Sequence, residues 1–191
     1  MKTLNNNTKR AKKVDINIYD YICKDEMTPI FTGVYHNNGE IAVSDKYILL
    51  VLKNYPYESR CEGKVIAKTG EVIKGKYPNY NAIKPGNNTE TIQIDRDNFS
   101  NAIKADKAKK RLLSAKEKKA HKAYYKINDI YLDLYETEKF INAMEYLGTD
   151  DIKICPIKKN RPILSETSKG WILLMPCTGI KENKTDNIYN A

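Results

Sequence analysis

The side chains best able to act as nucleophiles, general bases or metal ligands are few in this chain and widely spaced. Histidine occurs only at His36 and His121. Four cysteines are spread along the chain without a Cys-x-x-Cys pair: Cys23, Cys61, Cys155 and Cys177. A zinc site needs about four ligands close together, and this spacing does not supply them. We therefore expect no metal site, no cofactor, and four free thiols that are buried.

Carboxylates that could take part in acid–base catalysis have simpler explanations. Glu136 and Glu138 begin a predicted helix, where acidic side chains are stabilised by the helix macrodipole. Asp45 falls in a predicted turn, where an aspartate commonly accepts hydrogen bonds from the backbone. The sequence has no glycine-rich phosphate loop and no Ser/His/Asp pattern. We therefore expect that the protein is not an enzyme.

Basic side chains are the remaining candidates for chemistry, and they are concentrated in two segments. Residues 104–126 hold ten Lys or Arg side chains against Asp106 and Glu117, a net charge of +8, and residues 1–13 carry +5. The whole chain carries +9, so the rest of it is acidic, at −4. Such asymmetry favours a polyanionic partner. The alternative is a lysine-rich helix face that is merely solvated, and the sequence leaves both open.

The N-terminal half of the chain predicts a meander of antiparallel strands after a short helix near residues 15–22, with a short strand there as the alternative because Val14, Ile16 and Ile18 alternate. The stretches "PIFTGVYH" and "EIAVSDKYILLVLK" are rich in β-branched and aromatic residues, and the Asn-Gly between them is a hairpin signal. "GKVIAKTGEVIKG" repeats the pattern with Thr-Gly at its turn. The two prolines of "GKYPNYNAIKP", residues 75–85, each remove a backbone donor. This segment is predicted to end one sheet and begin a connector.

The C-terminal half predicts a strand at 91–94, an aspartate-capped helix rich in lysine, a single strand over residues 123–134, and an amphipathic helix ending before Gly148. Three further strands follow, in "DIKICPI", "RPILSE" and "GWILLMPC". This order of elements predicts an α+β fold dominated by antiparallel sheet, with helices packed on one side. Residues 1–13 and 179–191 are expected to be disordered.

The composition is that of a soluble protein, with 41% hydrophobic and 30% charged residues. No run approaches the length of a membrane span, and the basic N-terminus lacks the apolar run of a secretory signal. We therefore expect a cytoplasmic protein with no membrane partner.

Three segments, in this order, resemble the bacterial DNA polymerase III beta subunit, the sliding clamp. "TPIFTGVYHNNGEIAVSDKYILL" resembles the clamp stretch R-P-x-L-x-G-V followed by A-T-D-G-H-x-L. "GKYPNYNAIKPGNNTETIQIDRDNFSNAIK" is similar to the passage between clamp domains, G-x-F-P-x-Y-x-x-V-x-P and the strand and helix after it. "RPILSETSKGWILLMPC" resembles the clamp's C-terminal L-M-P-M-R. The resemblance covers roughly residues 16–178.

The chain also departs from the clamp pattern. Met27 and Thr28 stand where an arginine usually precedes the first proline, Lys46 replaces a glycine, and Thr178 replaces the C-terminal arginine. A clamp subunit has three domains, and this chain is about half as long. It resembles the last two domains, each reduced, over residues 14–85 and 86–178. The resemblance thus implies a DNA-clamp-like fold and leaves open whether a ring forms.

The resemblance implies a non-catalytic protein of DNA replication that holds or encircles duplex DNA as a processivity factor, with a homo-oligomer needed for a ring. Sliding requires that phosphates be neutralised without contacts to base edges. The candidate DNA-binding side chains are Lys104, Lys107, Lys109, Lys110, Arg111, Lys118, Lys119 and Lys122.

A second implied site is a hydrophobic groove that takes short peptides of replication proteins. An exposed apolar groove of adaptable shape suits such a partner, and methionine fits it well. The positions carried over from the family are Tyr47, Leu49, Pro85, Met175 and Pro176. The alternative is that all five are ordinary core or strand-end residues.

Two other functions remain open at this stage. An adaptor or clamp mimic would keep the peptide groove, form no ring, and bind a replication protein of a phage or mobile element. A simple non-specific DNA-binding protein would use only the central basic helix and the basic N-terminal segment. A sliding clamp should stay on circular DNA and be lost from linear DNA. An adaptor should bind the peptide without DNA, and a simple DNA-binding protein should be retained equally on both forms.

Overall fold

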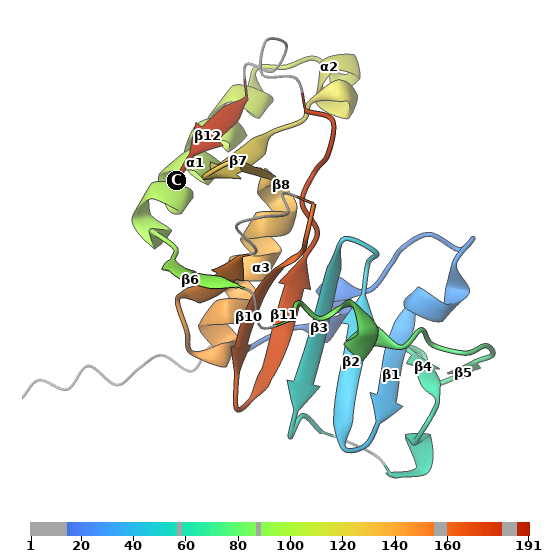
Figure 1. Cartoon of the computed structure of the whole chain (residues 1–191). Coiled ribbons are helices and arrows are strands. Elements are labelled where there is room, and N and C mark those ends of the chain that lie inside the picture. The colour runs from blue at the N-terminus through green and yellow to red at the C-terminus, as the bar shows by residue number, and fades with distance from the viewer. Residues whose placement is uncertain (1–14, 57–58, 87–88, 155–159, 181–186) are drawn as a thin grey trace, which may run out of the picture.

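The computed structural model describes residues 15–56, 59–86, 89–154, 160–180 and 187–191 (Figure 1). It contains a large antiparallel sheet, a smaller sheet and few helices, so the predicted α+β class is confirmed. The basic segment expected to be disordered, residues 1–13, lies outside the described residues. No helix in the described part of the chain is long and apolar enough to cross a membrane.

Within the described ranges, the large sheet has nine strands and takes members from both halves of the chain. All neighbouring pairs are antiparallel. From one edge to the other the strands are β5 (Val72–Ile73), β4 (Val65–Ala67), β1 (Gly33–Asn37), β2 (Glu40–Ser44), β3 (Ile48–Lys53), β11 (Gly170–Leu174), β10 (Ile163–Thr167), β9 (Asp151–Ile154) and β6 (Glu90–Gln93).

The predicted hairpin turns are confirmed by the backbone. β1 and β2 are joined at Asn38 and Gly39, which have φ angles of 52° and 75°. Both angles lie in the left-handed region that a two-residue hairpin turn requires, and Asn and Gly adopt it most readily. The Thr69–Gly70 turn likewise joins β4 to β5.

The two halves of the chain meet where β3 pairs with β11. The register runs from Ile48 opposite Leu174 to Leu52 opposite Gly170. At Gly170, φ is 148° and an added Cβ would lie 2.2 Å from the carbonyl oxygen of Val51. Only glycine therefore allows the end of β11 to come this close to β3.

The segment at 75–85 connects the two edges of this sheet. It follows β5 at one edge and leads to β6 at the other, and Figure 1 shows it crossing one face of the sheet in green. It contains a 3-10 helix, η4 (Tyr80–Ile83). The Tyr77 ring stacks on Tyr35 at a centroid distance of 4.7 Å, and Tyr80 packs 6.0 Å from Trp171. The tyrosines of this rigid segment thus cover the sheet face it crosses.

The opposite face carries the helices and the main core. α1 (Arg96–Arg111), α3 (Leu134–Leu147) and a three-stranded sheet pack there. That sheet has the order β12 (Ile188–Asn190), β7 (Tyr124–Ile127) and β8 (Ile130–Asp133). The fully buried side chains include Tyr125, Phe140 and Met144. α3 ends as predicted at Gly148, whose φ is 81°.

Short helices complete the fold. The predicted helix near residues 15–22 is a 3-10 helix, η1 (Ile18–Tyr21), and two others are η2 (Pro29–Phe31) and η3 (Ser59–Cys61). α2 (Ala115–Ala120) begins with a capping box, in which the Ser114 and Glu117 side chains each bond the other's backbone N–H. The lysine-rich region is therefore two helices rather than one.

Two expectations for the second half were wrong. The single strand expected over 123–134 is a hairpin, β7 and β8, because Asn128 adopts a φ of 52° and lets the chain turn. The C-terminal segment 179–191 is not disordered over its described end, because β12 pairs in parallel with β7. Residues 181–186 of that segment lie outside the described residues.

Candidate functional site

A groove of about 680 Å³ lies where the chain leaves β11. The backbone N–H of Met175 donates to the carbonyl of Tyr47 at 2.9 Å, and that of Cys177 donates to the carbonyl of Tyr131 at 2.7 Å. The segment after β11 thus bonds first to the turn before β3 and then to β8 of the small sheet. The groove lies at this junction and is lined by Tyr47, Lys122, Tyr124, Asp133, Glu136, Leu174, Met175, Pro176, Cys177, Thr178, Gly179 and Ile180.

The apolar side of the groove includes three of the five residues expected to bind peptides. Tyr47 is 63% exposed, Met175 is 39% exposed, and Pro176 lies beside Met175. Large apolar side chains left in water at one place commonly mark a binding surface. The long, flexible thioether of methionine can adapt to partner side chains of different shape.

The other two expected groove residues lie elsewhere. Leu49 is only 5% exposed and packs in the core beneath the connector, because alternate residues of β3 point to opposite faces of the sheet. Pro85 lines a separate, smaller pocket of about 430 Å³ together with Lys84 and Glu166. The structure therefore brings Tyr47, Met175 and Pro176 together and leaves Leu49 and Pro85 outside the groove.

A cluster of charged side chains ties the turn at Asp45–Tyr47 to helix α3. The ammonium group of Lys139 lies 2.8 Å from Oδ2 of Asp45 and 2.9 Å from Oε2 of Glu136. Burial, with the nearby charge of Asp45, raises the pKa of Glu136 to about 7, although Lys139 opposes that shift. Glu136 therefore does more than favour the helix dipole: it is a half-buried groove residue held by a cation.

The turn before β3 has the aspartate geometry expected from sequence. Oδ1 of Asp45 accepts hydrogen bonds from the backbone N–H groups of Tyr47 at 3.0 Å and Ile48 at 2.8 Å. Lys46, at the position where the resembling clamp motif has glycine, has a φ of 83°. Its ammonium group lies 2.8 Å from Oδ2 of Asp25. The backbone here keeps a conformation suited to glycine although the side chain is lysine.

Sequence reasoning missed the polar wall of the groove. Asp133 is the N-cap of α3, and its Oδ1 accepts from the N–H groups of Tyr135 and Glu136 at 2.9 and 3.1 Å. An aspartate just before an amphipathic helix is a recognisable cap signal, but nothing local places it beside Met175.

The groove also contains a thiol. Burial raises the pKa of Cys177, so its thiol stays protonated and is a poor nucleophile.

The eight candidate DNA-binding residues lie on α1, α2 and the segment just after α2. Seven are exposed, and Lys110 is half-buried with its ammonium 4.4 Å above the Tyr135 ring. Lys107 pairs with Glu138 at 2.7 Å, and Lys109 donates to Oδ1 of Asn187 at 2.6 Å. Lys122 also lines the groove. No ion pair among the described residues holds the other four, which are Lys104, Arg111, Lys118 and Lys119.

A buried carboxylate anchors the basic helix to the rest of the fold. Asp106 of α1 is fully buried. Its carboxylate accepts hydrogen bonds from the hydroxyl groups of Tyr135 at 2.7 Å and Tyr189 at 3.2 Å, and it lies 3.0 Å from Nε2 of His121. Burial alone would raise the pKa of Asp106, but bonds from Tyr135, His121 and Tyr189 hold it below its usual value. α1, α3 and β12 are thereby held together.

The cysteines are separated in the fold as they are in the sequence. Among the described residues, Cys23, Cys61 and Cys177 form no disulfide bond; Cys23 is buried and the other two are half-buried. Cys155 lies outside the described residues. Within the described ranges, no group of three or more His, Cys, Asp or Glu side chains could hold a metal ion.

No family model matches this sequence, and no curated protein sequence matches it. Solved structures do match. The Bartonella birtlesii DNA polymerase III beta sliding clamp, bound to griselimycin, superposes with a TM-score of 0.57 over 83% of this chain at 12% identity. The Caulobacter crescentus polymerase III beta subunit gives a TM-score of 0.59 over 83% at 11% identity. This chain covers 61% of each of those chains.

The fold is that of the bacterial sliding clamp, so the resemblance read from the three motifs is confirmed at the level of structure. A further match is the Helicobacter pylori beta clamp bound to a DNA ligase peptide, with a TM-score of 0.55, 16% identity and 84% of this chain covered. Here too the chain spans 61% of the matched clamp, less than two thirds of its length. Nothing in these matches bears on a phage or mobile-element origin.

Proposed function

We propose that this protein is a non-enzymatic, clamp-like factor of DNA replication. It holds duplex DNA through its basic helices and docks hydrophobic peptides of replication proteins in the groove beside Met175. The observation that carries the proposal is that Tyr47, Met175 and Pro176 line the same groove. These residues lie far apart in sequence and form one exposed apolar surface in a clamp fold.

The chemistry of the groove supports a peptide rather than a small charged ligand. Tyr47, Met175 and Pro176 offer apolar contacts, while Lys122, Asp133 and Glu136 supply both signs of charge. An extended peptide presents the same mixture of apolar anchors and backbone polar groups. The Helicobacter pylori clamp binds a DNA ligase peptide, which makes that peptide a suitable probe for this chain.

The basic helices support a partner bound through its phosphates. Lysine ammonium groups on exposed helix faces neutralise phosphates without reading base edges, so the binding is independent of sequence. Lys104, Arg111, Lys118 and Lys119 are exposed and outside any ion pair of the described residues. Cytoplasmic location and assembly into a homo-oligomer, which a closed ring would require, belong to the same proposal.

The groove is tested by titrating the full chain with a fluorescent DNA ligase peptide. A peptide with two or three apolar anchors should bind with micromolar affinity, roughly −8 kcal/mol. Met175→Ala should weaken binding by about 1–2 kcal/mol, because the thioether is an anchor. Ile83→Ala is the matched control, because Ile83 is 51% exposed but lies on η4, outside the groove.

Thermal melts of the same variants separate binding from folding. Met175→Ala should keep the wild-type melting temperature, because its side chain is partly exposed. Failure of the wild type to bind the peptide, or equal weakening by Met175→Ala and Ile83→Ala, would contradict the groove. Peptide binding without any binding of DNA would instead support the adaptor function.

A further inference from the structure

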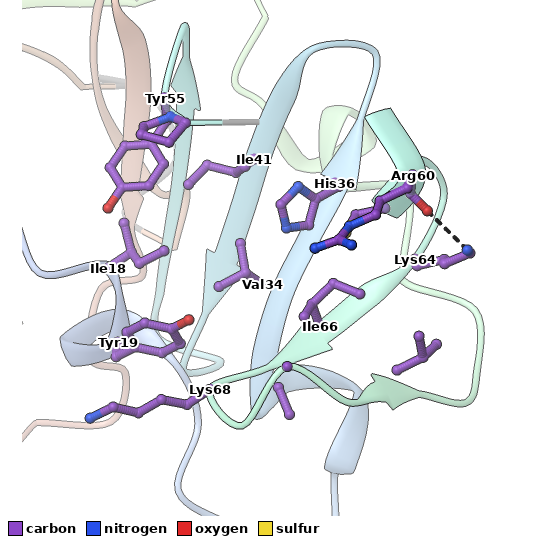
Figure 2. Close-up of a pocket in the computed structure, with 15 residues that line it drawn as sticks. Ile18, Tyr19, Val34, His36, Ile41, Tyr55, Arg60, Lys64, Ile66 and Lys68 are labelled. Atoms are coloured by element: carbon purple, nitrogen blue, oxygen red, sulfur yellow. Dashed lines mark hydrogen bonds between the residues drawn. The ribbon is translucent and has the colours of Figure 1, made fainter. Parts of the chain in front are cut away.

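A second groove, of about 630 Å³, lies on the helix-bearing face of the large sheet, over β1, β2 and β4 (Figure 2). Val34 and Ile41 form its floor and belong to the same core cluster as the buried residues of α3. Over β10 and β11 that face is covered by α3. Over β1, β2 and β4 the groove is bordered in the described structure by η1 and by short segments after β3 and at η3.

The walls of this groove are apolar and partly exposed. Figure 2 shows Tyr55 and Tyr19 along one side, with Ile66 on the sheet between the two sides. Tyr19, Tyr55 and Ile66 are half-buried, and Val72 is 55% exposed. Covering these side chains would remove apolar surface from water, which is the main favourable contribution to most protein association.

The rim of the groove is cationic. Every charged side chain that lines it in the described part of the chain is basic: Arg60, Lys64 and Lys68. In Figure 2 the Arg60 side chain extends toward His36, and the ammonium of Lys64 donates to the carbonyl of Arg60 at 2.9 Å. The Lys68 ammonium lies 5.5 Å from the centroid of the Tyr19 ring. The rim therefore favours an occupant that carries negative charge beside an apolar surface.

We propose that this groove docks an amphipathic helix of a partner protein, with an apolar face flanked by acidic side chains. A helix is favoured because β1, β2 and β4 each have a strand on both sides, and the edge strand β5, which carries Val72, is only two residues long and offers little for an added strand to pair with. A helix satisfies its own backbone hydrogen bonds and needs only an apolar face to dock on. α3 already packs in this way on the same face of the same sheet.

Charge argues against the chain's own segments as the occupant. Residues 1–13 carry five Lys or Arg side chains and no acid. The exposed faces of α1 and α2 in a second copy are also rich in lysine. A basic segment beside Arg60, Lys64 and Lys68 would be repelled. Duplex DNA would meet the basic rim but would not bury Ile66 or Val72, so an acidic helix satisfies more of the groove.

This inference does not depend on the proposed clamp function, because the groove over β1, β2 and β4 shares no lining residue with the groove beside Met175. The probe is a synthetic helical peptide of about 18 residues, five turns, in which leucines recur at helical spacing and glutamates flank them. Two matched peptides have lysine in place of every glutamate, or the same composition in scrambled order. Binding to the full chain is measured by fluorescence anisotropy, with a separate titration of duplex DNA.

The variants reverse charge at the rim or place a charge in the groove. Lys64→Glu with Lys68→Glu changes two exposed rim residues, and Val72→Asp charges an exposed groove residue. Lys74→Glu with Lys76→Glu makes the same change in net charge at exposed residues outside the groove. Thermal melts confirm that each variant is folded, and the rim pair and Val72→Asp are independent tests if one of them unfolds.

The acidic peptide should bind the wild type at least about tenfold more tightly than the basic and scrambled peptides. The rim pair and Val72→Asp should each weaken it about tenfold, while the control pair leaves binding nearly unchanged. Equal binding of acidic and basic peptides, or equal effects of rim and control pairs, would overturn the proposal. So would loss of DNA binding without loss of peptide binding in the rim pair, which would assign the rim to DNA.

Discussion

Lys46 adopts a left-handed backbone conformation, which is higher in free energy for lysine than for glycine. Its φ is 83°, and its ion pair with Asp25 lies at the surface, where such pairs add little stability. The clamp motif that the turn resembles has glycine at this place. A lysine therefore stands in a turn whose backbone conformation suits glycine.

Substitutions at Lys46 should separate backbone strain from charge. Lys46→Val should lower the melting temperature by about 2–4 °C, because a β-branched side chain fits the left-handed region poorly. Lys46→Gly should melt at or above the wild-type temperature. Asp25→Asn, which removes only the ion pair, is the control in thermal melts followed by circular dichroism. A Lys46→Gly variant that melts as low as Lys46→Val would rule out backbone strain as the cause.

Glu136 should make stability depend on pH in the neutral range. Its pKa is raised to about 7 in the folded protein, above a value of about 4.3 in an unfolded chain. The folded state thus holds the proton more tightly, and the stability linked to this group is present below about pH 4 and lost as pH rises toward 7. Deprotonation leaves a half-buried carboxylate near Asp45, with Lys139 as its compensating cation.

The variant Glu136→Gln removes this titration. Its melting temperature relative to wild type should rise as the pH increases from about 5 to about 8, because only the wild type acquires a charge on this half-buried side chain. Glu145→Gln, on the same helix but exposed, is the control. Melting curves whose difference does not change with pH would show that Glu136 does not titrate in this range.

At the scale of elements, the basic helices α1 and α2 should carry the interaction with DNA. Replacing Arg111, Lys118 and Lys119 with glutamine should weaken duplex binding. It should also make the log–log salt dependence less negative by about 0.9 for each phosphate that the variant no longer neutralises. The control carries Lys24→Gln, Lys74→Gln and Lys76→Gln, which change net charge equally at exposed sites outside these helices. Equal weakening in both triple variants would mean that only overall charge matters.

Elements with local signals could be predicted from the sequence. The Asn38–Gly39 turn, the two prolines at 78 and 85, and Gly148 after α3 each act through their own backbone preferences. The β7–β8 hairpin was missed because Asn128–Asp129 lies in a run that alternates like a single strand. β12 was missed because its stability comes from β7 and from the bond between Tyr189 and Asp106, which no local pattern reveals.

The candidate groove was predictable only in part, for the same reason. Tyr47, Met175 and Pro176 were named through the family resemblance and do line one groove. Leu49 was misplaced because the alternation of β3 turns it toward the connector. The opposite wall depends on the bond from Cys177 to Tyr131, which joins segments distant in sequence.

At the scale of the whole molecule, one continuous sheet joins the two halves of the chain through β3 and β11. The clamp fold extends over 83% of the chain in the Caulobacter crescentus match, yet spans 61% of that clamp. The proposed ring around DNA would need several copies of the chain to associate. The mass in solution, measured by light scattering, should be that of an oligomer if the protein encircles DNA.

The central claim is that the protein holds DNA as a clamp, and topology tests it most directly. Protein bound to nicked circular plasmid is washed at about 1 M salt, which screens phosphate contacts to a range of about 3 Å, and the plasmid is then linearised with a single cut. A clamp should stay on the circle through the wash and be released from the linear form. Equal retention on both forms, or loss from the circle in the wash, would contradict the claim.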